Sequence, residues 1–355
     1  MSTIRDVANL AQVSTTTVSR VINKSGAVRE GRRLRVERAI ADLDYVPNAV
    51  AQHLRSKRTK TIALVLSDIT NPFFTTIARG VQDVAGPRGY AVTFANTDES
   101  EAQEREYLRT LVQRKVDGVL LVPVGNSPEP YRLLRSQKIP VVLLDRRVST
   151  RQLDEVRCDS EAAAYALVQH LLALGHRRIA VITGRRDIST SSDRVAGYKR
   201  ALAFAGVPMD RGLIRYDSFS LAGGYRMTQD ILALQRRPTA VFATNNFIAF
   251  GALRALRERH IHVPGDMSLA TFDDLPEEWH DDPFLSVVAQ PAYELGRQAA
   301  ELLFERLETG DRGRRRVIVL PGAVIPRRSS GPPPDVASGV VADPKPLPAD
   351  RPSAD

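Results

Sequence analysis

The stretch TIRDVANLAQVSTTTVSRVIN, residues 3–23, decides how the N-terminal part of the chain folds. Its first half places apolar residues at helical spacing, at Ile4, Val7, Ala8 and Ala11. Thr3 and Asp6 have the spacing of an N-terminal cap and its reciprocal acid. The pattern therefore predicts a helix from about Ile4 to Leu10, followed by a turn at Gln12 to Ser14.

The second half of the stretch predicts another helix, which Ser14 would cap. Val18, Val21 and Ile22 would face inward, and the outward positions are Thr15, Thr16, Ser19 and Arg20. Short or charged hydrogen-bonding groups near the start of a recognition helix read base edges in the major groove of DNA. An ordinary solvated helix face has the same spacing, so the pattern alone leaves both interpretations open.

Charge is concentrated around this stretch. The chain has 355 residues and a formal charge of +9. Its first sixty residues hold twelve Lys or Arg and five Asp or Glu, a net charge of +7, so the remaining residues carry only +2. A compact basic head indicates a polyanion as partner, because nucleic-acid affinity comes from neutralised phosphates. A disordered basic tail is the alternative, but helical spacing continues through Leu34, Val36, Ile40 and Leu43 and predicts that the head folds.

This region continues as RVERAIADLDYVPNAVAQHLRS at residues 35–56. Its sequence closely resembles the DNA-binding head of the lactose-repressor and galactose-repressor (LacI/GalR) family of bacterial transcription regulators. The resemblance implies a helix-turn-helix domain at residues 1–46 that binds palindromic double-stranded operator DNA, with Thr15, Thr16 and Arg20 on base-reading positions. Gln12 departs from the glycine that is frequent at the family's turn, which puts the geometry of that turn in question.

Residues 47–60 are expected to form a hinge helix and linker. Pro47 stops the preceding helix, and Asn48 can cap two further turns, which are too short to be stable alone in water. The resemblance implies a helix that orders when two protomers lie on DNA, with Leu54 as a wedge in the minor groove. A plain linker is the alternative. The predicted DNA contacts of this segment are Asn48, Ala51, Leu54, Lys57 and Arg58.

From residue 61 to about residue 330, short apolar runs of strand length alternate with helical stretches, in two series. This alternation predicts an α/β fold of two lobes, each with a parallel sheet covered on both faces. Ligands bind such sheets at the carboxyl ends of the strands. Residues 331–355 contain seven prolines and no aromatic residue, so we expect a disordered tail.

Polar and aromatic residues follow many of the predicted strands, and any one of them alone could be a cap or turn residue. The resemblance extends to the family's effector domain, itself related to periplasmic sugar-binding proteins, and places most of them on effector-contact positions. Arg194 is expected at a strand-to-helix junction, opposite Asp273 on the other lobe. The candidate effector contacts are Phe73, Phe74, Asp145, Thr190, Arg194, Phe219, Asn245, Asp273 and Gln290, and Asn71 and Asn246 are further polar residues of this kind.

These side chains suit a sugar or sugar derivative, because they combine aromatic faces with hydrogen-bond donors and acceptors. The purine repressor of the same family shares several of them, which keeps a purine or nucleoside effector as the alternative. Ile188, however, stands where that repressor uses an arginine on the base. Loss of a charged donor from such a site costs about 1.5 to 3 kcal/mol. The sequence therefore favours a sugar.

The sequence offers no catalytic set, cofactor motif or metal-ligand spacing, and Cys158 reads as a small buried residue. The chain is therefore not expected to be an enzyme. A transport-type sugar-binding protein and a sugar-processing enzyme are the rival classes; the basic head and the missing secretory signal disfavour the first. We expect no membrane segment, and a cytoplasmic protein that joins the nucleoid when bound to DNA. Because the tail lacks the leucine heptads of a tetramer-forming coiled coil, we expect a homodimer.

Overall fold

The computed structural model describes residues 2–23, 25–46, 58–150, 152–275, 282–310 and 314–334. The predicted contacts Asn48, Ala51, Leu54 and Lys57 lie outside these ranges, as does most of the predicted tail. Internal contacts divide the chain into a head, which comprises Met1–Thr61 with Lys115–Asp117, and a body that comprises the remainder.

The described residues of the head form the helices α1 (Ile4–Leu10), α2 (Thr15–Ile22) and α3 (Glu30–Asp42). Thr3 and Asp6 form the predicted reciprocal cap of α1. Gln12 adopts the left-handed conformation, with φ +50°. The Val13 N–H then donates to the Ala8 carbonyl at 3.0 Å, which closes the turn in the way that a glycine usually does. The substitution of Gln12 for glycine has thus not prevented the turn.

The core of the head is small and aliphatic. Its buried residues come from all three helices: Val7, Ala8, Ala11, Val18, Val36 and Ala39. Leu34, which continues the helical apolar spacing, is 56% exposed and is not part of this core. Val36 and Ala39 occupy the face of α3 that meets the other helices, and Leu34 lies away from that face.

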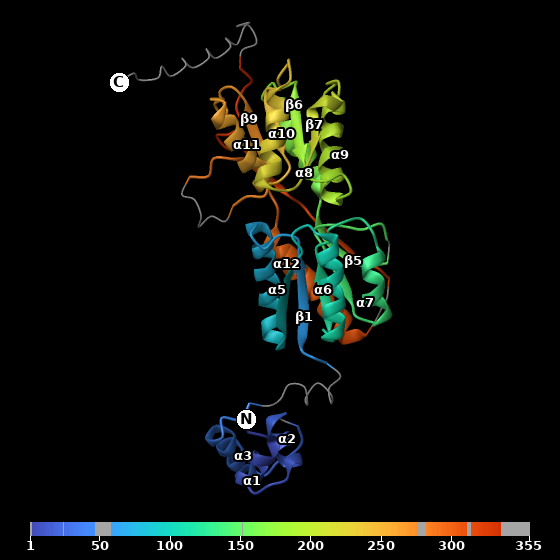
Figure 1. Cartoon of the computed structure of the whole chain (residues 1–355), viewed down its shortest axis with the longest axis vertical. Coiled ribbons are helices and arrows are strands. Elements are labelled where there is room, and N and C mark those ends of the chain that lie inside the picture. The colour runs from blue at the N-terminus through green and yellow to red at the C-terminus, as the bar shows by residue number, and fades with distance from the viewer. Residues whose placement is uncertain are drawn as a thin grey trace, which may run out of the picture. The chain divides into compact units, whose positions relative to one another are not determined.

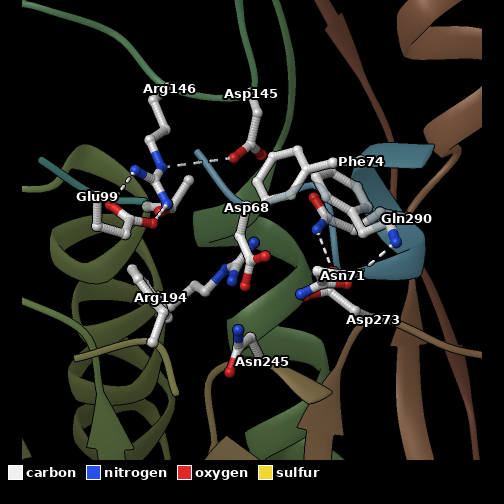
Figure 2. Close-up of a pocket in the computed structure, with 13 residues that line it drawn as sticks. Asp68, Asn71, Phe74, Glu99, Asp145, Arg146, Arg194, Asn245, Asp273 and Gln290 are labelled. Atoms are coloured by element: carbon white, nitrogen blue, oxygen red, sulfur yellow. Dashed lines mark hydrogen bonds and ion pairs between the residues drawn. The ribbon is translucent and has the colours of Figure 1, made fainter. Parts of the chain in front are cut away.

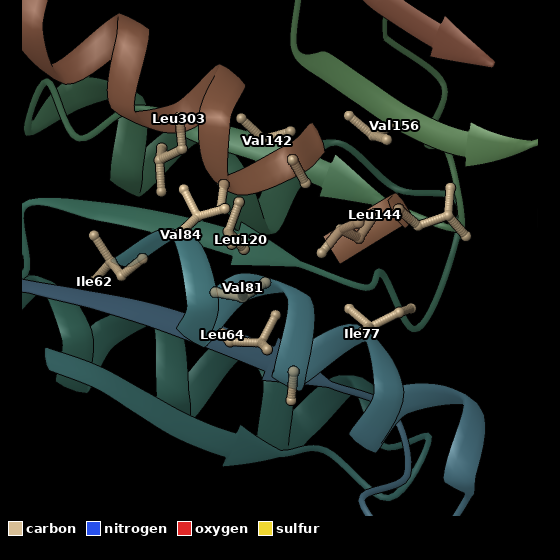
Figure 3. Packing of buried hydrophobic residues seen from close by; sticks show 14 of the residues in the cluster. Ile62, Leu64, Ile77, Val81, Val84, Leu120, Val142, Leu144, Val156 and Leu303 are labelled. Atoms are coloured by element: carbon tan, nitrogen blue, oxygen red, sulfur yellow. The ribbon is translucent and has the colours of Figure 1, made fainter. Parts of the chain in front are cut away.

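The first lobe of the body, here called the N-lobe, is built on a sheet with strand order β11-β5-β4-β3-β1-β2. Its strands are β1 (Thr61–Leu66), β2 (Ala91–Asn96), β3 (Gly118–Leu121), β4 (Val141–Leu144), β5 (Asp154–Cys158) and β11 (Val317–Leu320). The accompanying helices are α5 (Pro72–Ala85), α6 (Glu101–Gln113), α7 (Arg132–Ser136) and α12 (Ala292–Thr309). Figure 3 shows Leu64, Leu120 and Val142 of the sheet packed against Val81 of α5 and Leu303 of α12.

The second lobe, here called the C-lobe, has strand order β12-β10-β9-β8-β6-β7. Its strands are β6 (Ile179–Thr183), β7 (Ile214–Tyr216), β8 (Ala240–Ala243), β9 (Ser268–Phe272), β10 (Ser286–Ala289) and β12 (Ala323–Ile325). Helices α8 (Ser160–Ala173) and α9 (Ser189–Phe204) pack on one face, and α10 (Leu221–Leu232) and α11 (Asn246–Glu258) on the other (Figure 1). β12 runs antiparallel to β10, and the pairings β10–β9, β9–β8, β8–β6 and β6–β7 are parallel.

The chain passes between the lobes three times, after β5, after β10 and after β11. Gly322 lies in the last crossing, and a Cβ atom there would stand 2.9 Å from Val288 and 3.3 Å from the Cys158 sulfur. The three crossings therefore lie close together. Three short 3-10 helices complete the fold, at Gly86–Arg88, Glu129–Tyr131 and Arg211–Leu213. The predicted fold class is confirmed.

Candidate effector pocket and DNA-binding surface

A pocket lies where the strands of both lobes end (Figure 2). The structure brings all nine predicted effector contacts into its lining, together with Asn71. Sequence reasoning missed three lining residues, Asp68, Glu99 and Arg146. Each of these follows β1, β2 or β4 within a few residues, so their position after a strand was the signal that could have found them.

Two buried carboxylates face this pocket, one from each lobe. Asp145 follows β4 and Asp273 follows β9, and they are 7% and 6% exposed. Burial raises the pKa of Asp145 to about 6, although Arg194 and Arg146 act in the opposite direction. Burial likewise raises the pKa of Asp273, against the lowering effects of Arg194 and of a hydrogen bond from Gln290. The charge of Asp145 is therefore sensitive to pH near 6.

Arg194 lies in the second turn of α9, 3% exposed, and its guanidinium stands 4.1 Å from the centre of the Phe272 ring. One Nη atom donates to the Thr244 carbonyl at 2.5 Å. The expectation that Asp273 faces Arg194 from the other lobe is wrong, because α9 and β9 both belong to the C-lobe. The carboxylate contributed by the N-lobe is Asp145. The expected strand-to-helix junction is also wrong, since α9 begins at Ser189.

Arg146 is held in place by Glu99. Its guanidinium makes a two-point contact with the Glu99 carboxylate at 2.6 and 2.8 Å and donates to the Pro123 carbonyl at 3.1 Å. Glu99 itself has φ +58°, in the left-handed region that non-glycine residues seldom adopt. The Arg146 guanidinium lies 5.5 Å from the centre of the Phe219 ring, which comes from the C-lobe. An N-lobe cation and a C-lobe aromatic face therefore meet at the pocket.

The ring of Phe219 packs directly against Gly184, the residue that follows β6. A Cβ atom at Gly184 would stand 2.2 Å from the Phe219 ring, so only glycine allows this close approach. Across the pocket, Phe73 and Phe74 pack edge to face with ring centres 5.1 Å apart. The pocket consequently offers flat apolar surfaces from both lobes.

Asn71 and Asn246 join the lobes beneath the pocket. Each amide donates to the other's oxygen, at 2.9 and 3.0 Å, and each oxygen also accepts a backbone N–H at the start of its own helix. Asn246 is absent from the pocket lining, whereas its neighbour Asn245 is present. Ile188 is also absent from the lining and is 2% exposed, which fits a packing role.

Four buried polar atoms of the lining have no hydrogen-bond partner within the described part of the chain. Two are acceptors, Asp145 Oδ1 and Gln290 Oε1, and two are guanidinium donors, Nε of Arg146 and Nε of Arg194. Buried polar groups are nearly always satisfied in native proteins, by protein, water or ligand. The pocket is therefore suited to a molecule that both donates and accepts hydrogen bonds.

On the head, Thr15, Thr16 and Arg20 are exposed on α2, as predicted for reading positions. Ser19 is only partly exposed, and the Asn23 amide donates to its hydroxyl at 3.2 Å. Arg58 is exposed beyond the helices. The remaining predicted DNA contacts lie outside the described residues.

Other chemistry finds little support in the parts of the chain that the structure describes. Within them, no group of three or more His, Cys, Asp or Glu side chains could hold a metal ion. None of the described helices is both long and apolar enough to cross a membrane.

Comparison with known proteins follows the division between head and body. Residues 3–48 match the family described as bacterial regulatory proteins, lacI family. Residues 59–325 match the family described as periplasmic binding proteins and sugar binding domain of LacI family.

Three relatives illustrate the range of likeness. The chain is 35% identical to the HTH-type transcriptional repressor PurR of Vibrio atlanticus, over 89% of this chain and 95% of that one. It is 33% identical to a LacI family regulator from Enterococcus faecium solved with bound ribose, over 77% of this chain and 99% of that one, with a TM-score of 0.69. The lac repressor dimer bound to operator and an anti-inducer has 26% identity, covers 93% of this chain and 99% of its own, and has a TM-score of 0.81.

Proposed function

The chain belongs to the lacI family of bacterial regulatory proteins and is a DNA-binding, ligand-responsive transcriptional repressor; we propose that its effector is an uncharged sugar such as a free pentose. The observation that carries this proposal is the set of four buried polar atoms in the described lining that have no hydrogen-bond partner. A sugar hydroxyl donates one hydrogen bond and accepts others. It can therefore satisfy a carboxylate acceptor and a guanidinium donor at the same time.

The charges of the pocket favour a neutral ligand over a phosphorylated one. Four carboxyl groups line it, from Asp68, Glu99, Asp145 and Asp273, and the cations are Arg146 and Arg194. One of those cations is already paired with Glu99. A phosphate would enter a site with an excess of buried acid, where desolvated like charges repel strongly. A sugar without phosphate avoids this cost.

The flat aromatic surfaces of Phe74 and Phe219 in the lining favour a compact ring such as a monosaccharide. The regulator from Enterococcus faecium, solved with bound ribose, supports a ligand of this class. A purine is the second candidate, because a relative of similar identity is the repressor PurR. The isoleucine at position 188, packed away from the pocket, counts against a purine.

We further propose that the chain acts as a homodimer in the cytoplasm, on the nucleoid, at a palindromic operator. Two heads related by twofold symmetry read two half-sites, so operator symmetry reflects protein symmetry. The operator complex of the lac repressor dimer supports this arrangement. Effector binding would change how the lobes meet, and would be coupled to operator affinity by about 1 to 3 kcal/mol.

Calorimetric titration of the full chain tests the proposal directly. We expect D-ribose or another free pentose to bind with a 1:1 stoichiometry per chain, and ribose 5-phosphate and hypoxanthine to bind at least tenfold more weakly. Operator affinity, measured with and without the bound compound, then gives the sign of the coupling. Tight binding of hypoxanthine, or preference for the phosphate ester, would contradict the proposed ligand class.

A further inference from the structure

A second contact between the lobes lies beside the pocket and outside its lining. Arg147, in the loop after β4 of the N-lobe, contacts Asp193 on α9 of the C-lobe. Both Nη atoms of Arg147 pair with the two carboxylate oxygens of Asp193, each at 2.5 Å. The backbone N–H of Arg147 also donates to the Ser189 hydroxyl at 3.0 Å, at the first residue of the same helix. Three hydrogen bonds thus join one loop to one helix.

The position of this pair in the sequence connects it to the effector site. Arg147 comes two residues after Asp145, and Asp193 comes immediately before Arg194. Asp145 and Arg194 both line the pocket, one from each lobe, and each carries an unpartnered polar atom there. The contact between Arg147 and Asp193 therefore fixes the loop and the helix that present these two groups.

We propose that Arg147 and Asp193 are positioning residues for the effector site, and that their ion pair holds the two lobes in the arrangement in which Asp145 and Arg194 face the same ligand. This inference rests on the proposed function of the pocket. Neither residue touches the ligand space. Their ion pair shifts the equilibrium toward the conformation in which the two lobes are in contact. A ligand that contacts both lobes binds only to that conformation.

The geometry makes this pair stronger than an ordinary surface contact. Exposed ion pairs contribute little unless their geometry is bidentate and well fixed. Here the contact is bidentate, the Asp193 side chain is only 13% exposed, and a backbone donor adds a third bond. Arg147 itself is 38% exposed. Another ion pair between the lobes, Arg185 with Glu101 at 3.3 Å, is made by two exposed side chains through a single atom pair, and the buried contact between Asn71 and Asn246 is uncharged.

The chain offers a matched control. Arg226 of α10 pairs with Asp217 through two hydrogen bonds of 2.9 and 2.8 Å, and both residues belong to the C-lobe. The Arg226→Met variant removes a bidentate pair of the same chemistry without touching the contact between the lobes. The Arg147→Met variant removes the proposed one.

Lobe separation is measured in the full chain by spin labels at Glu106→Cys on α6 and Lys199→Cys on α9, diluted with unlabelled chains. Both sites are exposed, whereas Cys158, the sole native cysteine, is 2% exposed. We expect Arg147→Met to populate longer distances in the ligand-free protein and Arg226→Met to leave the distribution unchanged. Asp193→Asn should repeat the effect of Arg147→Met, and the charge swap Arg147→Asp with Asp193→Arg should largely restore the parent distances.

Affinity for D-ribose gives the second measurement. Arg147→Met should weaken binding about fivefold to tenfold, at the lower end of ordinary coupling between sites, and Arg226→Met less than twofold. An unchanged distance distribution in both Arg147→Met and Asp193→Asn would overturn the inference. If the parent chain fails to bind D-ribose, the proposed ligand is wrong, while the distances still decide the role of the ion pair.

Discussion

Asp145 and Asp273 occupy equivalent places in the two lobes. Both residues have left-handed backbone, with φ +60° and +67°. Each N–H donates across to the neighbouring strand at 3.0 Å, from Asp145 to the Val156 carbonyl and from Asp273 to the Val288 carbonyl. The same turn at the end of a parallel strand thus delivers one carboxylate from each lobe to a single pocket. A ligand bound between them contacts both lobes by the same chemistry.

The raised pKa of Asp145 predicts a pH dependence of stability. Between about pH 4 and pH 6 the folded protein holds a proton on Asp145 that the unfolded chain has lost, because burial raises this pKa from 3.8 to about 6. The contribution of Asp145 to stability is therefore greatest below its unfolded pKa and is lost as the pH rises through 6. Asp145→Asn should stabilise the ligand-free protein at pH 7.5: its unfolding free energy should rise by up to about 3 kcal/mol, and its melting temperature should rise with it.

The same substitution provides its own control, since the gain should shrink toward zero near pH 4. Sugar affinity of the parent should rise with pH through 6, as Asp145 becomes an ionised carboxylate that accepts hydrogen bonds from sugar hydroxyls. A stability gain that is equal at pH 4 and pH 7.5 would show that Asp145 does not titrate in this range.

Arg194→Ala should abolish the response to the effector. The variant removes an unpartnered donor and the cation that both carboxylates face. If the effector releases the repressor from DNA, operator binding without ligand should stay intact; if the effector is a corepressor, tight operator binding should never appear. Fluorescence anisotropy with operator DNA distinguishes the two. Undiminished ligand affinity, or a melting temperature far below that of Arg226→Ala, would assign Arg194 to structure alone.

Gly184→Ala should block the pocket without affecting the head. The added methyl group would meet the Phe219 ring at 2.2 Å and push it toward the ligand space or Arg146. We expect loss of sugar binding by at least tenfold, with operator affinity of the ligand-free protein within twofold of the parent. Titration of sugar and of operator on the same preparation checks both. Retained sugar affinity would mean that Phe219 moves freely and is not a wall of the site.

Arg20→Ala should lower operator affinity by about 1 to 3 kcal/mol and relax specificity at one base pair, because Arg20 is exposed on the reading face of α2. Lys57→Ala should instead weaken binding to all sequences alike and flatten the salt dependence. Binding to the operator and to random DNA over a range of salt concentrations separates the two effects. Equal losses on both DNAs for Arg20→Ala would remove it from the reading positions.

Sequence periodicity predicted the main helices and the buried strands well, because these carry clear apolar patterns. It missed α7, β7, β11 and β12, which have three to five residues each and too little pattern to detect. The nine predicted effector contacts reached one pocket because strand ends converge in parallel sheets. Glu99 and Arg146 were missed because their role depends on a pairing between loops far apart in sequence. For the same reason, Asp273, the residue expected to face Arg194, was placed on the wrong lobe.

The repeated crossing between lobes has a consequence for synthesis of the protein. The N-lobe needs α12 for its core and β11 for its sheet edge, and both are translated after the whole of β6 to β10. On the ribosome, the head can fold as soon as it emerges, whereas the N-lobe must wait for about residue 320. An unfinished chain would therefore carry a folded basic head and an incomplete sensor. Ligand sensing is therefore the last property of the chain to be completed during synthesis.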